Sequence, residues 1–128
     1  MGSLDGQVAI VTGSSSGIGE ATARRLAAEG ARIVVNSASS VAAGERIAAQ
    51  LPGAIYVRAD IADETQCKAL IDAALQRLGR LDILINNAGV WPENPAGSGD
   101  LEAWDRAFAV NTRGAFLVTE ISAPLEAA

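Results

Sequence analysis

The segment that most constrains this chain is a glycine-rich turn between an apolar run and an Ala-rich stretch. The turn reads Thr12-Gly13-Ser14-Ser15-Ser16-Gly17-Ile18-Gly19. The preceding run, residues 8–11, predicts a buried strand, and residues 17–29 predict a helix that stops at Gly30. Glycine allows positive φ angles and close approach to a ligand, and a helix N-terminus presents unpaired N–H groups. The turn therefore predicts a phosphate-binding loop, with a plain Gly/Ser turn as the alternative.

The rest of the chain alternates short apolar runs with longer helical stretches. The predicted strands are 32–35, 54–57 and 83–85, and the predicted helices are 41–51, 63–78 and 101–122. Asp63 is expected to cap its helix in a capping box with Gln66, and residues 92–99 form a Pro/Gly/Ser loop. The strands are apolar on both faces, which is typical of a parallel sheet covered by helices on each side.

Four β–α units in series predict an α/β doubly wound fold. Right-handed crossovers give the strand order 3-2-1-4, with the switch point between the first and fourth strands. Ligands bind at the carboxyl ends of strands beside such a switch point. The length of 128 residues suggests one domain.

Composition excludes several classes of function. The net charge of −5 and the pI near 4.6 argue against nucleic acid or an anionic membrane as a partner. The chain contains no histidine and one cysteine, Cys67, so no disulfide within the chain and no metal site is expected. No secretory leader is recognised, and no apolar stretch reaches the roughly 18 residues of a membrane span, so the expected location is the cytoplasm.

Four motifs together resemble the short-chain dehydrogenase/reductase family. They are the Thr12–Gly19 loop, Asp60-Ile61 after the third strand, Asn86-Asn87-Ala88-Gly89 after the fourth, and Asn111 in the last helix. The resemblance implies a Rossmann-type, dinucleotide-binding domain over residues 1–128, truncated after the fourth β–α unit. It implies Asn111 as a catalytic residue. It implies an adenine contact at Asp60-Ile61. It implies cofactor contacts from Gly13, Ser15, Ser16, Gly17, Ile18, Gly19, Ser37, Asp60, Ile61, Asn86, Asn87, Ala88 and Gly89.

Each of these residues also has a structural interpretation. Asp60 could be a turn residue at a strand end, and Asn86 and Asn87 could cap exposed backbone. Asn111 could be a polar residue tolerated in a helix. Apolar residues at helical spacing usually form core, so the aromatic residues of the last helix could be a packing stripe; they are Trp104, Phe108 and Phe116, with Leu117 beside them.

The family's proton-transfer motif, Tyr-x-x-x-Lys, does not occur in the 128 residues. Tyr56 and Lys68 are the single tyrosine and lysine, and the residue four after Tyr56 is Asp60. The family's hydride transfer acts on a small carbonyl or alcohol substrate, and the residues that would contact it lie beyond this stretch. We therefore expect the cofactor-binding part of an NAD(P)-dependent oxidoreductase, inactive alone. The alternatives are a non-catalytic nucleotide-binding module and an interaction protein that keeps only the scaffold.

The residues after the second strand bear on the choice of dinucleotide. In NAD-preferring members an acidic residue there bonds the ribose hydroxyls, and the matching residue here is Ser37. The positions that carry a basic residue in NADP-preferring members are Ala38 and Ser14. Ser37 and Ser39 could donate to a 2′-phosphate, so the sequence favours NADP(H) over NAD(H).

The last helix predicts association. It is apolar on more than one side, with Leu101, Trp104 and Phe108 on one track and Val110 and Ile121 on others. The strand at 83–85 would also present an open apolar edge, which is a template for pairing. In the resembling family this helix commonly lies at a subunit interface, so we expect a homo-oligomer.

Overall fold

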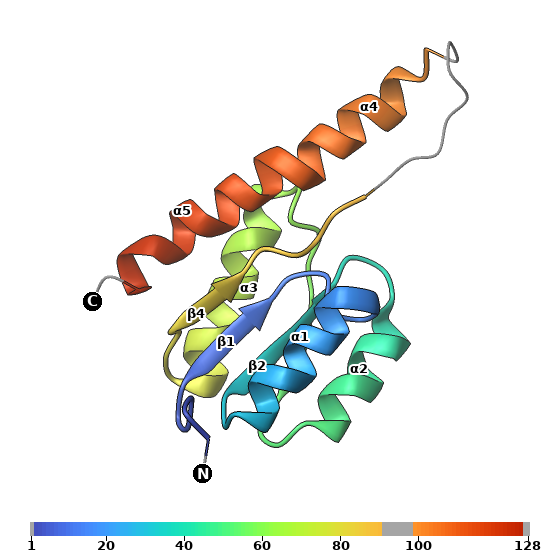
Figure 1. Cartoon of the computed structure of the whole chain (residues 1–128). Helices are drawn as coiled ribbons and strands as arrows, with labels where there is room; N and C mark the ends of the chain where they lie inside the picture. The colour runs from blue at the N-terminus through green and yellow to red at the C-terminus, as the bar shows by residue number, and fades with distance from the viewer. Residues whose placement is uncertain (1, 91–98, 127–128) are drawn as a thin grey trace.

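The computed structural model describes residues 2–90 and 99–126, which form one parallel sheet with helices on both faces (Figure 1). The sheet order is β3-β2-β1-β4, so the predicted doubly wound fold and its strand order are confirmed. The strands are β1 (Val8–Val11), β2 (Arg32–Ser37), β3 (Ile55–Arg58) and β4 (Ile83–Ile85). The carboxyl ends of β1 and β4 therefore lie side by side at the switch point.

The helices divide between the two faces of the sheet. Helices α1 and α2 pack on one face, and α3 and α5 pack on the other (Figure 1). Their bounds are α1 (Gly17–Ala28), α2 (Val41–Gln50), α3 (Glu64–Leu78), α4 (Leu101–Phe108), the π-helical segment η1 (Ala109–Gly114) and α5 (Ala115–Glu126). Helix α4, η1 and α5 form one continuous helical segment, whose α5 end packs on α3 and β4 and whose α4 end extends past the carboxyl ends of the strands (Figure 1).

Alternation along β1 divides the core into two layers. Val8 and Ile10 face the layer under α3 and α5, whereas Ala9 and Val11 face the layer under α1 and α2. All four side chains are fully buried. The period of two is the strand repeat, and burial on both faces explains why the run shows no polar alternation.

Two local predictions need correction. Strand β2 runs two residues further than expected, because Asn36 and Ser37 pair with β3 and bond their polar side chains inside the fold. Asp63 caps α3 through Thr65 N and Gln66 N, as expected. Gln66, however, does not return to the Asp63 N–H as a capping box requires. Its Oε1 accepts from Asp60 N at 2.7 Å, because Asp63 N already donates to the Asp60 carbonyl.

The predicted helix over 101–122 is interrupted. Six residues around Asn111 form η1, and α5 then continues through Pro124 to Glu126. A π-helical turn inserts one residue into the helical repeat and frequently marks a functional site. Two tertiary contacts account for its place here: the Asn111 side chain bonds the backbone of Val90, and Gly114 lies against Ile61.

The predicted loop at 92–99 lies outside the described residues except for Gly99. Among the helices that are described, none has both the length and the apolarity to cross a bilayer. Over the same ranges, no three His, Cys, Asp or Glu side chains come together as a metal-binding group.

Candidate functional site

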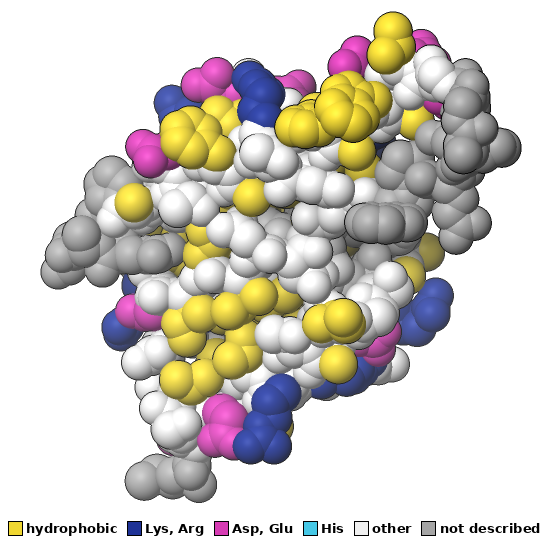
Figure 2. Space-filling model, turned by 45° about the horizontal axis from the view of Figure 1, so that its top comes forward, with side chains coloured by type: hydrophobic (Ala, Val, Ile, Leu, Met, Phe, Trp, Pro, Cys, Tyr) yellow, Lys and Arg dark blue, Asp and Glu magenta, His cyan; other side chains and the backbone are white. Residues whose placement is uncertain are grey.

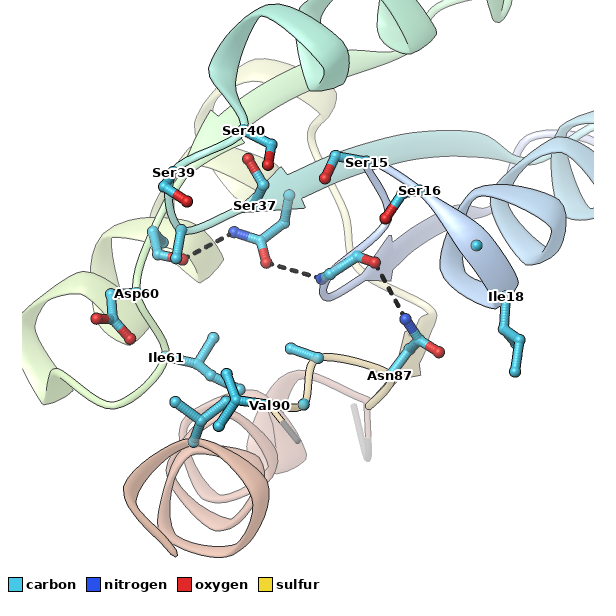
Figure 3. Close-up of a pocket in the computed structure, with 18 of the residues that line it drawn as sticks. Ser15, Ser16, Ile18, Ser37, Ser39, Ser40, Asp60, Ile61, Asn87 and Val90 are labelled. Carbon is cyan, nitrogen blue, oxygen red and sulfur yellow. Dashed lines mark hydrogen bonds between the residues drawn. The ribbon is translucent and has the colours of Figure 1, made fainter. Parts of the chain in front are cut away.

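A pocket of about 420 Å³ opens at the carboxyl ends of the strands, beside the switch point. Ser15, Ser16, Ser37, Ser39 and Ser40 lie along one wall, and Ile61 and Val90 face them across it (Figure 3). The glycine loop, the residues after β2 and β3, the Asn87–Val90 segment and α4 all contribute to its lining. It therefore lies where open parallel sheets bind ligands.

Each glycine of the loop meets a distinct backbone requirement. Gly13 and Gly17 have φ angles of +64° and +57°, in the left-handed region that favours glycine. A Cβ on Gly13 would also lie 2.8 Å from Ala88 Cα. Gly19 has no such φ, but a Cβ there would overlap the Asn87 side chain and the Gly13 carbonyl. The loop is therefore closed against the Asn87 segment at van der Waals distance.

Thr12 links the glycine loop to the segment after β4. Its buried hydroxyl accepts from Asn87 N and Ala88 N, both at 3.0 Å, and its backbone N–H donates to the Ile85 carbonyl. Asn87 Nδ2 returns to the Gly13 carbonyl at 3.1 Å. These bonds hold two segments that are more than seventy residues apart in the sequence in one rigid cradle.

Asn36 links the same loop to the other side of the sheet. The side chain is 1% exposed; its Oδ1 accepts from Gly13 N at 3.1 Å, and its Nδ2 donates to the Val57 and Ala59 carbonyls at 3.1 and 3.2 Å. Ser14 Oγ adds a bond from the Asn36 N–H, and its own proton goes to the Val11 carbonyl. Ser14 is fully buried, so this position does not face the pocket.

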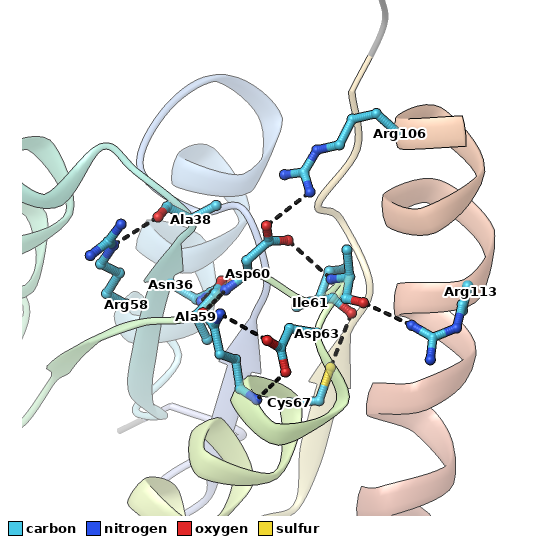
Figure 4. Close-up of polar contacts among 12 residues, drawn as sticks. Asn36, Ala38, Arg58, Ala59, Asp60, Ile61, Asp63, Cys67, Arg106 and Arg113 are labelled. Carbon is cyan, nitrogen blue, oxygen red and sulfur yellow. Dashed lines mark hydrogen bonds and ion pairs between the residues drawn. The ribbon is translucent and has the colours of Figure 1, made fainter. Parts of the chain in front are cut away.

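Asp60 stands at the end of β3 with its carboxylate held by two donors. Oδ1 accepts from Ala62 N at 3.0 Å, and Oδ2 accepts from Arg106 Nη1 of α4 at 2.8 Å (Figure 4). Partial burial acts to raise the pKa of Asp60, but the bonds from Arg106 and Ala62 outweigh it and hold that pKa below its ordinary value. The carboxylate is therefore ionised, and acts only as an acceptor, at neutral pH.

Most of the sequence-predicted cofactor residues line this one pocket. They are Gly13, Ser15, Ser16, Gly17, Ile18, Ser37, Asp60, Ile61, Asn87, Ala88 and Gly89. Ile18 is 80% exposed at its mouth. Gly19 is not part of the lining and acts through the close packing of the loop.

Asn86 and Asn111 lie elsewhere. Asn86 is exposed, and its Nδ2 donates to Thr119 Oγ1 of α5 at 2.9 Å. Asn111, in η1, accepts from Val90 N at 2.7 Å and donates to the Val90 carbonyl at 2.8 Å. Asn111 thus fixes the chain as it leaves the cradle.

Six lining residues were not identified as site residues from the sequence: Asn36, Ser40, Ala59, Val90, Arg106 and Val110. One feature of the sequence could have indicated Asn36: it is a polar residue that directly follows the apolar run 33–35 of β2. Arg106 and Val110 reach the pocket only because α4 and η1 cross the end of the sheet, and nothing in their local sequence indicates that crossing.

The single tyrosine and the single lysine are both outside the pocket lining. Tyr56 packs over Gly44 of α2, and its hydroxyl shares a 2.5 Å hydrogen bond with Ser37 Oγ. Lys68 is exposed on α3. The described pocket therefore offers backbone donors, hydroxyls, carboxamides, one carboxylate and one guanidinium, but no tyrosine–lysine pair.

Comparison with known proteins identifies the class that this fold and pocket define. The family model described as short chain dehydrogenase matches residues 7–126. The chain belongs to this family.

Individual relatives agree with that assignment. The chain is 48% identical over 120 residues to a Streptomyces violaceoruber protein assigned by name as a ketoacyl reductase of the granaticin polyketide synthase, covering 91% of this chain and 48% of that protein. It superimposes on a Brucella melitensis 3-ketoacyl-(acyl-carrier-protein) reductase complexed with NADH with a TM-score of 0.88, 41% identity, and coverage of 96% of this chain and 51% of the other.

A Burkholderia cenocepacia short chain dehydrogenase in complex with NADP gives a TM-score of 0.91 at 33% identity, covering 95% of this chain and 51% of that one. The chain spans about half the length of the curated relatives it matches.

Proposed function

We propose that residues 1–128 form a dinucleotide-binding domain, and that the pocket at the switch point holds a nicotinamide dinucleotide. The observation that carries the proposal is the cradle itself: Gly13 and Gly19 pack against the Asn87 segment so closely that a Cβ on either would overlap it. Such closeness lets backbone N–H groups approach a pyrophosphate at the start of α1. Relatives whose structures contain NADH or NADP support the same class of ligand.

The residues present fit such a ligand along its length. The N-cap of α1, Ser16, makes no side-chain cap bond, so the first-turn N–H groups remain available to phosphate. Ile18 offers an exposed apolar surface at one end, and Asp60 and Ile61 offer an acceptor and a backbone N–H at the other. The glycine loop and Asn87 lie between these ends.

Equilibrium binding by isothermal titration tests the proposal. We expect saturable one-to-one binding of NAD⁺ or NADP⁺ by the purified chain, and at least about a tenfold weaker association for Gly13→Ala, since a methyl group there displaces the Ala88 backbone. Ser3→Ala, at an exposed hydroxyl far from the pocket, is the matched control. A wild-type chain that binds neither nucleotide would contradict the proposal.

For the longer protein of which such a chain is the cofactor-binding part, we propose NAD(P)-dependent oxidoreduction of a carbonyl or alcohol substrate. When bound, the nicotinamide supplies hydride transfer. The relatives named as ketoacyl reductases support this reaction class. General acid–base transfer needs a side chain within hydrogen-bond reach of the reacting oxygen. The Asn111 side chain instead hydrogen-bonds the backbone N–H and carbonyl of Val90.

We propose that the 128-residue polypeptide alone does not turn over, because it contains no Tyr-x-x-x-Lys. The same observation favours a second candidate function, nucleotide binding without chemistry. A steady-state assay of the pure chain with a panel of ketone substrates distinguishes them from a working enzyme: ordinary turnover would contradict both.

We further propose that NADP(H) is preferred. Residues 37–40 carry no acidic side chain to repel a 2′-phosphate, and Ser37, Ser39 and Ser40 line that end of the pocket. Arg58 donates from Nε to the Ala38 carbonyl at 2.9 Å, so a guanidinium adjoins the same segment. Titration with both nucleotides measures the preference, and clearly tighter NAD⁺ binding would contradict it.

A homo-oligomer remains our proposal for the assembly. Hydrophobic side chains gather over α4 and α5, and Trp104, Phe108 and Phe116 are between 51% and 61% exposed there (Figure 2). The Trp104 and Phe108 rings lie against each other with centroids 4.8 Å apart and planes tilted by 37°. Aromatic residues are enriched at protein–protein interfaces relative to the rest of the surface. Sedimentation equilibrium tests it, and a stable monomer at high concentration would refute it.

A further inference from the structure

Arg106 is the one cationic side chain among the described residues that line the pocket. It extends from α4 to Asp60, with Nη1 2.8 Å from Oδ2 (Figure 4). The two side chains are 45% and 29% exposed, so a simple surface ion pair would contribute little to stability. Its position inside a binding pocket suggests a role in the ligand site.

The contacts around Asp60 fix the direction of its carboxylate. Its backbone is held by Gln66 Oε1, which accepts from Asp60 N, and by Asp63 N, which donates to the Asp60 carbonyl. Oδ1 is tied to Ala62 N, and Oδ2 is tied to Arg106. A carboxylate offers about four lone-pair positions, so about two remain for a ligand.

Arg106 determines how this carboxylate is presented. The χ2 torsion of an aspartate is broad and roughly two-fold, so one tether to Ala62 leaves Oδ2 free to rotate. The second tether, from α4, removes that freedom. Partial burial acts to raise the pKa of Asp60, but the bonds from Arg106 and Ala62 outweigh it, so the carboxylate is an acceptor for a ligand donor at neutral pH.

The backbone N–H of Ile61 places a hydrogen-bond donor beside the Asp60 acceptor, and such a pair can hydrogen-bond a purine base. The N–H of Ile61, next to Asp60, donates to no acceptor within residues 2–90 and 99–126. An acceptor beside a donor matches the edge of adenine, which presents the 6-amino donor beside the N1 acceptor. Hypoxanthine reverses both, with a 6-oxo acceptor beside an N1 donor, so it would leave Asp60 and Ile61 unpaired.

The helix that carries Arg106 has other attachments to the same loop. Arg113 Nη1 donates to the Ala62 carbonyl at 2.8 Å (Figure 4), and a Cβ on Gly114 would lie 2.8 Å from the Ile61 carbonyl oxygen. Removal of Arg106 therefore leaves η1, which continues directly from α4, anchored to this loop. Arg113 also provides a matched control, because it holds the same loop but does not line the pocket.

We propose that Arg106 is a positioning residue for base recognition: by holding the Asp60 carboxylate it makes the pocket select a 6-aminopurine nucleotide over its 6-oxo analogue. The inference rests on the proposed function and deepens it. Arg106 acts through Asp60 and does not itself need to contact the base.

The test compares, by isothermal titration, the affinity of the full chain for whichever of NAD⁺ and NADP⁺ binds more tightly and for the hypoxanthine form of that nucleotide. We expect Arg106→Ala to weaken adenine nucleotide binding about fivefold to tenfold, as loss of one partly exposed charged contact implies, and to leave the hypoxanthine form nearly unchanged. The discrimination ratio then falls. Arg106→Lys should restore part of the ratio, and Arg113→Ala should keep it at the wild-type value.

The possible results distinguish a failure of the Arg106 proposal from a failure of the proposed dinucleotide binding. A wild-type chain that binds neither nucleotide overturns both. A wild-type chain that binds, with an Arg106→Ala ratio equal to its own, overturns the inference alone. Tighter binding by Arg106→Ala would show that Arg106 competes with the base for Asp60, and would also overturn it. If Arg106→Ala fails to fold, Arg106→Lys and Asp60→Asn carry the comparison, and an unchanged ratio in both overturns the proposal.

Discussion

Replacing Asn36 with alanine removes the side chain that joins the glycine loop to β3. Three hydrogen bonds disappear together, and the Gly13 N–H and the Val57 and Ala59 carbonyls lose their partner. Each bond is worth about 1 kcal/mol net, and partly buried groups left unpaired cost somewhat more, so the free energy of unfolding should fall by about 3 kcal/mol. That is a large part of the roughly 5–15 kcal/mol available to a domain.

Urea unfolding followed by circular dichroism measures this loss. With a slope of about 2 kcal/mol/M, Asn36→Ala should lower the midpoint by about 1.5 M. Asn86→Ala is the matched control, because it removes one exposed bond, to Thr119, and should change stability by less than about 0.5 kcal/mol. Equal midpoint shifts in the two variants would refute the reasoning that Asn36 joins the loop to the sheet.

Three further perturbations test other parts of the structure. Gly19→Ala puts a methyl group against the Asn87 side chain, so calorimetry should show dinucleotide affinity at least about tenfold weaker, and unaltered affinity would contradict a closed cradle. Asp82 accepts from Arg80 and from Val8 N, and these bonds, chiefly the one from Arg80, lower its pKa. The stability that the ionised Asp82 contributes is therefore present at neutral pH and is lost as pH falls through that lowered pKa. Asp82→Asn should lower the free energy of unfolding by about 1 kcal/mol at pH 7 and flatten the acid side of the plot of urea midpoint against pH. Parallel plots for the variant and the wild type would contradict this prediction. Phe108→Ser with Phe116→Ser should shift sedimentation toward the monomer, and unchanged mass would argue against the aromatic face as the interface.

Much of the fold could be predicted because its signals are local. Buried strands such as Val8–Val11, the glycine stops, and the Asp63 cap depend on a few neighbouring residues, and the structure matches their bounds within two residues. Strand order followed from the handedness of crossovers, which is a general rule and not a property of this sequence. The glycine loop was recognisable because its backbone requirements leave few residue choices.

The remaining features depend on contacts between distant segments. Gln66 has the spacing of a capping box, but the Asp63 N–H donates to the Asp60 carbonyl instead of to Gln66. The π-helical segment arises where Asn111 bonds Val90 and Gly114 meets Ile61, and neither contact is visible in the helical pattern. Arg106 lines the pocket only because α4 crosses the carboxyl ends of the strands, and nothing in the helical pattern indicates that crossing.

We propose above that a nicotinamide dinucleotide binds in the pocket at the β1–β4 switch point. Amide chemical-shift mapping of the ¹⁵N-labelled chain during titration with NADP⁺ and NAD⁺ tests it most directly. We predict saturable shifts concentrated in residues 13–19, 59–61 and 87–90, with the α3 surface around Lys68 unaffected. Saturable binding whose shifts avoid these three segments, or no shifts at all, would contradict it.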